Sequence, residues 1–139
     1  MTNPRRLLCT ALLPLTLTAC GGASAATADA QASPEGLVST AYQDLAAAEF
    51  GKVCDLVLPD ARAKFTLIGS DCQTYLAKQY DPTRRAALDA VKIDASRTRT
   101  NGDTAVVPED AVTFHGQPSN DADTTTAKQD GKWWLTLDQ

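Results

Sequence analysis

The sequence predicts an α+β fold, with three to four short N-terminal helices packed on a curved four-stranded antiparallel sheet. Apolar residues recur every three or four positions between Pro34 and Leu88, a spacing typical of helices with one buried face. After Leu88 the spacing changes to two, as in half-buried strands, and Asn101-Gly102 and Asp130-Gly131 are typical of tight hairpins. Helices followed by hairpin-linked strands indicate helices packed on an antiparallel sheet.

The first expected helix begins at Ser33-Pro34-Glu35. Serine caps a helix start, proline suits the first turn, and an acid there faces the positive end of the helix dipole. Phe50-Gly51 is expected to interrupt this helix, and a second helix is expected from Lys52 to Leu58. The first helix presents one apolar stripe, made of Val38, Ala41, Tyr42 and Leu45.

Three further turns or short helices are expected before Leu88. Pro59-Asp60 opens one that ends at Gly69, Ser70 caps the next, and Asp81-Pro82 repeats the cap-and-proline start for the last.

Four strand regions follow. The first is Val91 to Ser96, and the second, Thr104 to Phe114, is interrupted by Pro108, which predicts a bulge, a break or an edge. After a polar loop over residues 116–123, the last two strands are Thr124 to Gln129 and Lys132 to Leu137. In the last strand the alternate residues Trp133, Leu135 and Leu137 share a face and are expected to close the core.

The first 19 residues are typical of a bacterial export signal. Arg5-Arg6 precedes the 13 mostly apolar residues Leu7 to Ala19, which are too few for a membrane span of about 20 residues. Leu17-Thr18-Ala19-Cys20 resembles a lipobox, which implies cleavage before Cys20 and acylation of its thiol, with palmitate among the acyl chains. The alternative is an ordinary signal peptide cleaved near Ala23-Ser24-Ala25, which would remove Cys20.

This interpretation divides the chain into a removed signal (1–19), a lipidated cysteine with a flexible tether (20–33) and a single domain (34–139). It predicts a protein anchored by lipid on the outer face of the cytoplasmic membrane. Without residues 1–19 the chain carries 11 basic and 17 acidic residues, a formal charge of −6. A nucleic-acid partner is therefore not expected, because such proteins need a basic surface.

Two of the four cysteines remain after the signal and the lipidated residue are set aside. An even pair in an exported domain is most simply a disulfide, so Cys54 and Cys72 are expected to be bonded. Free thiols and a catalytic cysteine are the alternatives. No metal site is expected, because two thiols and the single His115 are one ligand short of a zinc site, and no cofactor is expected.

The chain resembles the small exported lipoproteins of actinobacteria that have a nuclear-transport-factor-like (cystatin-like) domain. The resemblance rests on the end of the first helix (Leu45 to Phe50), on Lys52 to Leu56 with Pro59 to Arg62, and on the closing strand Asp130 to Leu135. It implies a cone-shaped domain whose open end holds a pocket, with Val38, Tyr42, Tyr75 and Trp133 as its expected lining.

The function expected from these observations is a noncatalytic binding module for a small apolar ligand or a partner protein. The resemblance also allows a homodimer through the sheet face. The alternative is a small hydrolase or isomerase that uses a pocket carboxylate with His115, the only histidine. Asp44 and Asp55 are expected on solvated helix faces, and Asn120 to Asp123 as a surface loop, because it lacks the glycine and glutamate of a calcium loop.

Overall fold

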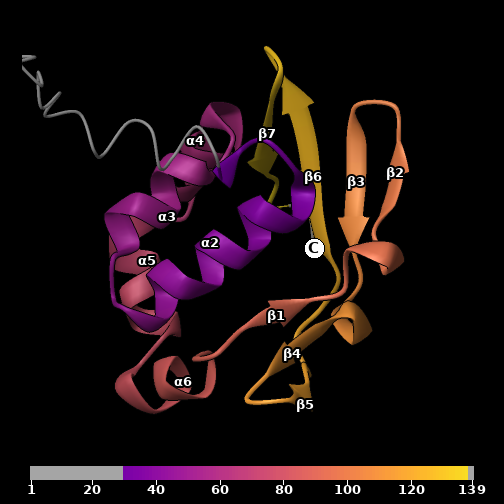
Figure 1. The fold of residues 1–139 in the computed structure, drawn as a ribbon. Coiled ribbons are helices and arrows are strands. Elements are labelled where there is room, and N and C mark those ends of the chain that lie inside the picture. Colours follow the sequence, from indigo (N-terminus) through magenta and orange to yellow (C-terminus); the bar gives the residue numbers. More distant parts are fainter. Residues whose placement is uncertain (1–29, 138–139) are drawn as a thin grey trace, which may run out of the picture.

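The computed structural model describes residues 30–137, which form an α+β fold with the helices on one side and the strands on the other (Figure 1). This confirms the predicted class and the order of helices before strands. Five α-helices come first, at Pro34–Ala46 (α2), Phe50–Leu56 (α3), Pro59–Leu67 (α4), Cys72–Gln79 (α5) and Pro82–Ala87 (α6).

Helix α2 begins where the sequence predicted. The Ser33 hydroxyl oxygen accepts a hydrogen bond from the Gly36 amide at 3.0 Å, and Pro34 occupies the first turn. Its end differs from the prediction, because Phe50 and Gly51 start α3 instead of interrupting α2. The chain turns at Ala48, whose φ of 61° is left-handed.

Two backbone hydrogen bonds close this turn. The Glu49 amide donates to the Asp44 carbonyl at 2.8 Å, and the Ala48 amide donates to the Leu45 carbonyl at 3.1 Å. This is the Schellman arrangement, in which glycine is the usual residue at the left-handed position. Alanine there left no signal in the sequence, so the helix end was placed too late.

The last two helices, α5 and α6, are capped by aspartates. Asp81 caps α6 as predicted, with its carboxylate accepting from the Arg84 amide at 2.8 Å. The predicted cap of α5, Ser70, is wrong by one residue: Asp71 accepts from the Thr74 amide at 2.9 Å. Two acceptors stand side by side at this helix start, and the carboxylate is the one that meets the third amide of the helix.

The strands form two antiparallel sheets instead of the single four-stranded sheet predicted. The larger one has the order β2-β3-β6-β7, a meander, and the smaller one has the order β1-β4-β5. The strands are Lys92–Ile93 (β1), Arg99–Asn101 (β2), Thr104–Val107 (β3), Val112–Phe114 (β4), Gln117–Pro118 (β5), Thr124–Gln129 (β6) and Lys132–Leu135 (β7).

Two breaks, opposite each other, divide one long hairpin into these two sheets. Asp94 ends β1 because its carboxylate accepts from the Ser96 amide at 3.1 Å and starts a 3-10 turn. Pro108 ends β3 and precedes a second 3-10 turn, Glu109–Ala111, as its missing amide hydrogen suggested. The Asp94 amide still donates to the Ala111 carbonyl at 2.9 Å, so the hairpin bends without separating.

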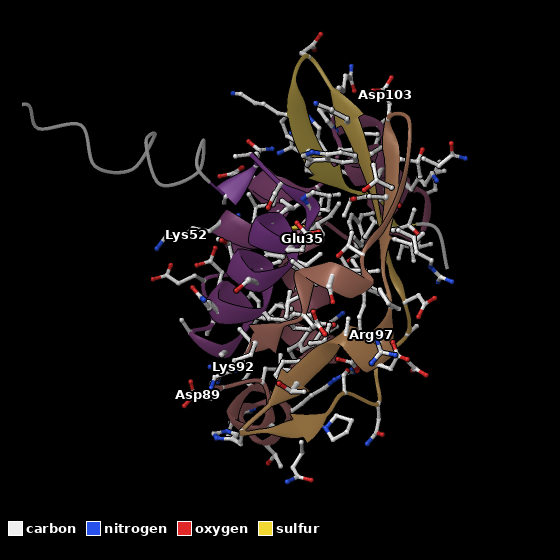
Figure 2. The ribbon with its side chains drawn as sticks, turned by 45° about the vertical axis from the view of Figure 1, so that its right-hand side comes forward. Glu35, Lys52, Asp89, Lys92, Arg97 and Asp103 are labelled. Carbon is white, nitrogen blue, oxygen red and sulfur yellow. A yellow bond between two sulfur atoms is a disulfide. The ribbon has the colours of Figure 1, made fainter. Side chains whose placement is uncertain are left out.

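Arg97 fastens this bend. Its guanidinium donates to the Asp110 backbone carbonyl at 3.0 Å and forms an ion pair with the Asp110 carboxylate. Figure 2 shows Arg97 on the strand side of the molecule and Lys52 on the opposite, helical side. The bend lets both sheets face the same layer of helices.

The core lies between α2 and the concave face of the strands. Its completely buried members come from α2, α3 and the strands, and include Leu37, Val38, Leu56, Val107 and Val112. Trp133 and Leu135 point into this core as predicted, while Leu137 is 36% exposed. A parallel bridge between Val57 and Leu135 joins the end of α3 to the last strand.

The packed region includes residues that the sequence analysis assigned to the tether. Gln31 is only 3% exposed, and it pairs with Trp133 twice. The Gln31 carbonyl accepts from the Trp133 amide at 3.0 Å, and the Gln31 side-chain amide donates to the Trp133 carbonyl at 3.1 Å. The packing thus extends to Gln31, three residues before Pro34. The predicted signal and Cys20 lie outside the described residues.

Candidate functional site

A cavity of about 230 Å³ lies between the helices and the larger sheet. Side chains from α2, α3, α4 and α5 form its deep walls, and the end of β7 with the start of β6 forms the opposite wall. The deep walls are mostly apolar and include Val38, Leu45, Val53, Phe65 and Leu76. Such a wall favours apolar groups, because it removes them from water without offering hydrogen bonds.

Two of the four predicted pocket residues line this cavity, namely Val38 and Tyr42. Trp133 is a core residue beside Gln31, outside the lining, and so is not part of the pocket. Tyr75 is also outside the lining and packs its ring against Phe65, with the centroids 5.1 Å apart. The helical spacing of α5 turns Leu76 to the cavity in place of Tyr75.

The mouth of the cavity lies between α6 and the loop over residues 119–123. Arg84 and Asp123 line it with about half of each side chain exposed (45% and 48%). The Arg84 guanidinium is 3.5 Å from the Asp121 carboxylate, and it stacks 4.5 Å above the ring of Tyr80. The mouth is therefore polar and charged where the interior is apolar.

Sequence reasoning missed this loop, which it treated as ordinary surface. Long-range contacts place it on the cavity. The Ser119 amide donates to the Val112 carbonyl at 2.8 Å, and the Asp123 carboxylate accepts from the Glu109 amide at 2.9 Å and pairs with Arg99 at 3.3 Å. Partners 7 to 24 residues away leave no local pattern, so no signal in the sequence could have identified this position.

Tyr42 joins the apolar interior to the polar mouth. Its ring packs edge-on against Phe114 with the centroids 5.0 Å apart, and it is only 8% exposed. Burial, followed by the neighbouring Asp121 carboxylate, raises the pKa of the Tyr42 hydroxyl far above its usual range. The hydroxyl therefore stays protonated and acts as a hydrogen-bonding group of the site, with Asp121 and Thr124 as its partners.

Stability should fall in alkali because of Tyr42. An unfolded tyrosine loses its proton at roughly pH 10, whereas the raised pKa in the fold keeps the proton bound. Above that pH the unfolded state holds fewer protons, so the free energy of unfolding decreases as pH rises. We expect urea midpoints to decline above about pH 10, and Tyr42→Phe to weaken this decline. An unchanged alkaline slope in Tyr42→Phe would contradict this account.

His115 lies away from the cavity. It occupies the tight turn between β4 and β5 with a φ of 50°, next to Gly116 at 76°, and it is exposed. Its ring nitrogen Nε2 is 3.5 Å from the Ala86 carbonyl, and no described carboxylate pairs with it. The pairing of a pocket carboxylate with His115, which the hydrolase or isomerase alternative requires, is therefore not formed, because the histidine belongs to a hairpin turn.

The remaining polar candidates are also outside the cavity. Asp55 is exposed and 3.5 Å from Arg62, as expected of a solvated helix face, and Asp44 is half-buried.

The predicted dimer face, the outer side of the larger sheet, carries Val106, Ala127 and Trp134, each half-buried. No assembly is described, so the dimer remains a prediction.

The disulfide prediction is confirmed. Cys54 of α3 is bonded to Cys72 of α5, with their Cα atoms 6.0 Å apart. Cys72 also lines the cavity, so the bond forms part of its wall. The disulfide thus holds α5 in place as one side of the site.

Other kinds of site find no support within residues 30–137. No cluster of three or more potential metal-ligating side chains occurs there. In the same range, no helix combines the length and apolar character needed to cross a bilayer. No protein-family model, curated protein or solved structure matches this chain.

Proposed function

We propose that this protein is an exported, lipid-anchored module that binds a small, largely apolar ligand in the cavity between α2 and the larger sheet. The observation that carries the proposal is the apolar interior behind a polar mouth. The volume of about 230 Å³ exceeds the roughly 150 Å³ of an apolar protein cavity that takes up benzene. A ring or a short alkyl chain therefore fits the interior.

A small ligand suits this site better than the surface of a partner protein. Val38 and Leu45 are almost fully buried, although they line the cavity, so they are accessible only to a group that enters it. Protein partners instead bind through broad exposed patches of about 800 Å² on each side. Ligand sites are typically concave and mostly apolar, with a few placed polar groups such as the Tyr42 hydroxyl.

The shape of the sheet supports a cone-like, cystatin-like fold as the finer description. The hairpin that carries β1 to β4 bends at Asp94 and Pro108, and α2 crosses the concave side of the strands (Figure 1). A bent sheet wrapped around one helix can enclose space beside that helix, and the cavity lined by α2 and the larger sheet supports this description. This fold hosts both enzymes and binding proteins, so the function rests on the site.

Binding of hexan-1-ol tests the ligand proposal. The mature protein in lipid nanodiscs should bind this probe saturably by calorimetry, with empty nanodiscs as the blank. Leu76→Trp should fill the cavity from α5 and weaken binding at least tenfold. Leu67→Trp is the matched control, because Leu67 is 85% exposed and outside the cavity, and it should bind as wild type does. Equal binding by both variants would refute the cavity as the site.

The anchor is tested separately. We expect the mass of the native protein to correspond to a chain that starts at Cys20 and carries acyl groups. Cys20→Ser should lose acylation and move the protein from the membrane fraction to the soluble or unprocessed fraction. A chain that begins after Ala25 and carries no lipid would support the ordinary signal peptide instead.

A further inference from the structure

The charges around the cavity mouth are paired with one another. Three charged residues line the cavity, Arg84, Asp121 and Asp123. Arg84 lies 3.5 Å from Asp121, and Asp123 lies 3.3 Å from Arg99 of β2. Each described acid of the mouth thus has an arginine beside it, and the two pairs together are neutral.

Backbone groups and the ring of Tyr80 occupy most of the remaining hydrogen-bonding and ion-binding positions of these side chains. Asp123 also accepts the Glu109 amide at 2.9 Å, and Arg84 also donates to the Gln79 carbonyl at 3.3 Å. The face of the Tyr80 ring, which would attract a cation, already carries the Arg84 guanidinium at 4.5 Å. A charged ligand head would therefore meet one like charge for every opposite charge.

From this pairing we infer that the ligand is uncharged: a neutral apolar molecule with one hydroxyl group, placed at Tyr42. The inference rests on the proposed function and adds the chemical class of the ligand. An ionised head would lose its water and find no net counter-charge at the mouth, a cost that a neutral head does not bear. A hydroxyl can instead donate to a remaining lone pair of the Tyr42 or Thr124 oxygen, both in the lining.

Variants that remove one charge of the Arg84–Asp121 pair test whether this pairing excludes charged ligands. Without Arg84, the Asp121 carboxylate loses its partner and should attract a cation. Without the charge of Asp121, the Arg84 guanidinium is free to attract an anion. Since both groups are partly exposed, each change should alter the preference by about three- to fivefold.

The experiment compares hexan-1-ol, hexanoate and hexylammonium at pH 7, which share one chain length and differ in head charge. Titrations of the mature protein in nanodiscs, with empty nanodiscs subtracted, should give the tightest binding for hexan-1-ol. Arg84→Gln should gain affinity for hexylammonium relative to hexan-1-ol, and Asp121→Asn should gain relative affinity for hexanoate. Arg62→Gln is the control, because Arg62 pairs with Asp55 outside the cavity, and this variant should leave the relative affinities unchanged.

The outcomes separate the two proposals. Wild type that binds all three probes equally, or prefers either ion, overturns the neutral-ligand inference and leaves the cavity as a binding site. Binding of none of the three overturns the proposed function and the inference with it. Variants that leave the relative affinities for the three probes unchanged show that the paired charges do not set the selectivity, and the inference is then wrong.

Discussion

Trp133→Ala should lower the free energy of unfolding by about 3–5 kcal/mol, the usual cost of truncating a large buried aromatic side chain. Trp133 is 6% exposed and belongs to the core cluster that α2 and α3 share with the strands. Its removal leaves a cavity that the surrounding helices and strands can fill only in part. Chemical denaturation of wild type and variant measures the difference.

The neighbouring tryptophan provides the control. Trp134 points to the opposite face of β7, is half-buried, and donates its indole hydrogen to the Gln129 carbonyl at 3.3 Å. Trp134→Ala should therefore cost only about 1 kcal/mol. Equal losses in the two variants would mean that the alternation of β7 between core and solvent is wrong, and with it the register against β6.

The parts of the fold that the sequence predicted well are those set by local chemistry. Ser33 and Asp81 cap helices through their own side chains, and Asp130-Gly131 forms a tight turn with φ values of 53° and 78°. The Cys54–Cys72 bond was predicted from the expected export of the domain and from the even number of cysteines left in it, without any knowledge of geometry. In each case the residues that determine the structure lie within a few positions of one another or are unique by type.

The parts that the sequence did not predict depend on contacts between distant residues. Asp94 and Pro108 interrupt their strands at opposite positions, and only the pairing of those strands turns two local breaks into one bend between two sheets. The alternation of residues 91–96 was read correctly as strand character, but the Asp94 side chain ends the strand at Ile93. An apolar residue at every second position does not reveal where an aspartate side chain will bind a backbone amide and interrupt the hydrogen bonds between the strands.

The candidate site shows the same contrast between features set by nearby residues and features set by distant contacts. Val38 and Tyr42 were correctly predicted to line the pocket, because they belong to the apolar stripe of α2, which has to face the interior of any fold. Tyr75 was expected in the lining but packs against Phe65 beside it, and a helix with no fully buried residue has a weakly defined apolar face. Asp121 reached the mouth through a loop held by distant partners, so nothing near it in the sequence marked it as part of a site.

Removal of the disulfide should lower the free energy of unfolding by about as much as Trp133→Ala. The loss should, however, be concentrated in one part of the domain. The bond joins residues 18 positions apart, for which the chain-entropy model gives about 3 kcal/mol. We expect Cys54→Ala/Cys72→Ala to lose about that much in denaturation. Reduced wild type should approach the stability of the variant, and the variant itself should not respond to the reductant.

The local effect should be concentrated in α5. This helix has no fully buried residue, and besides the disulfide its packing includes the ring contact of Tyr75 with Phe65 and the half-buried Leu76. Without the bond, amide hydrogen exchange should accelerate in Cys72–Gln79 more than in α2, whose Leu37 and Val38 remain in the core. Because Cys72 and Leu76 form one wall of the cavity, binding of hexan-1-ol should weaken in parallel. Uniform acceleration across α2 and α5, with binding unchanged, would show that the bond stabilises the whole domain and not the wall of the site.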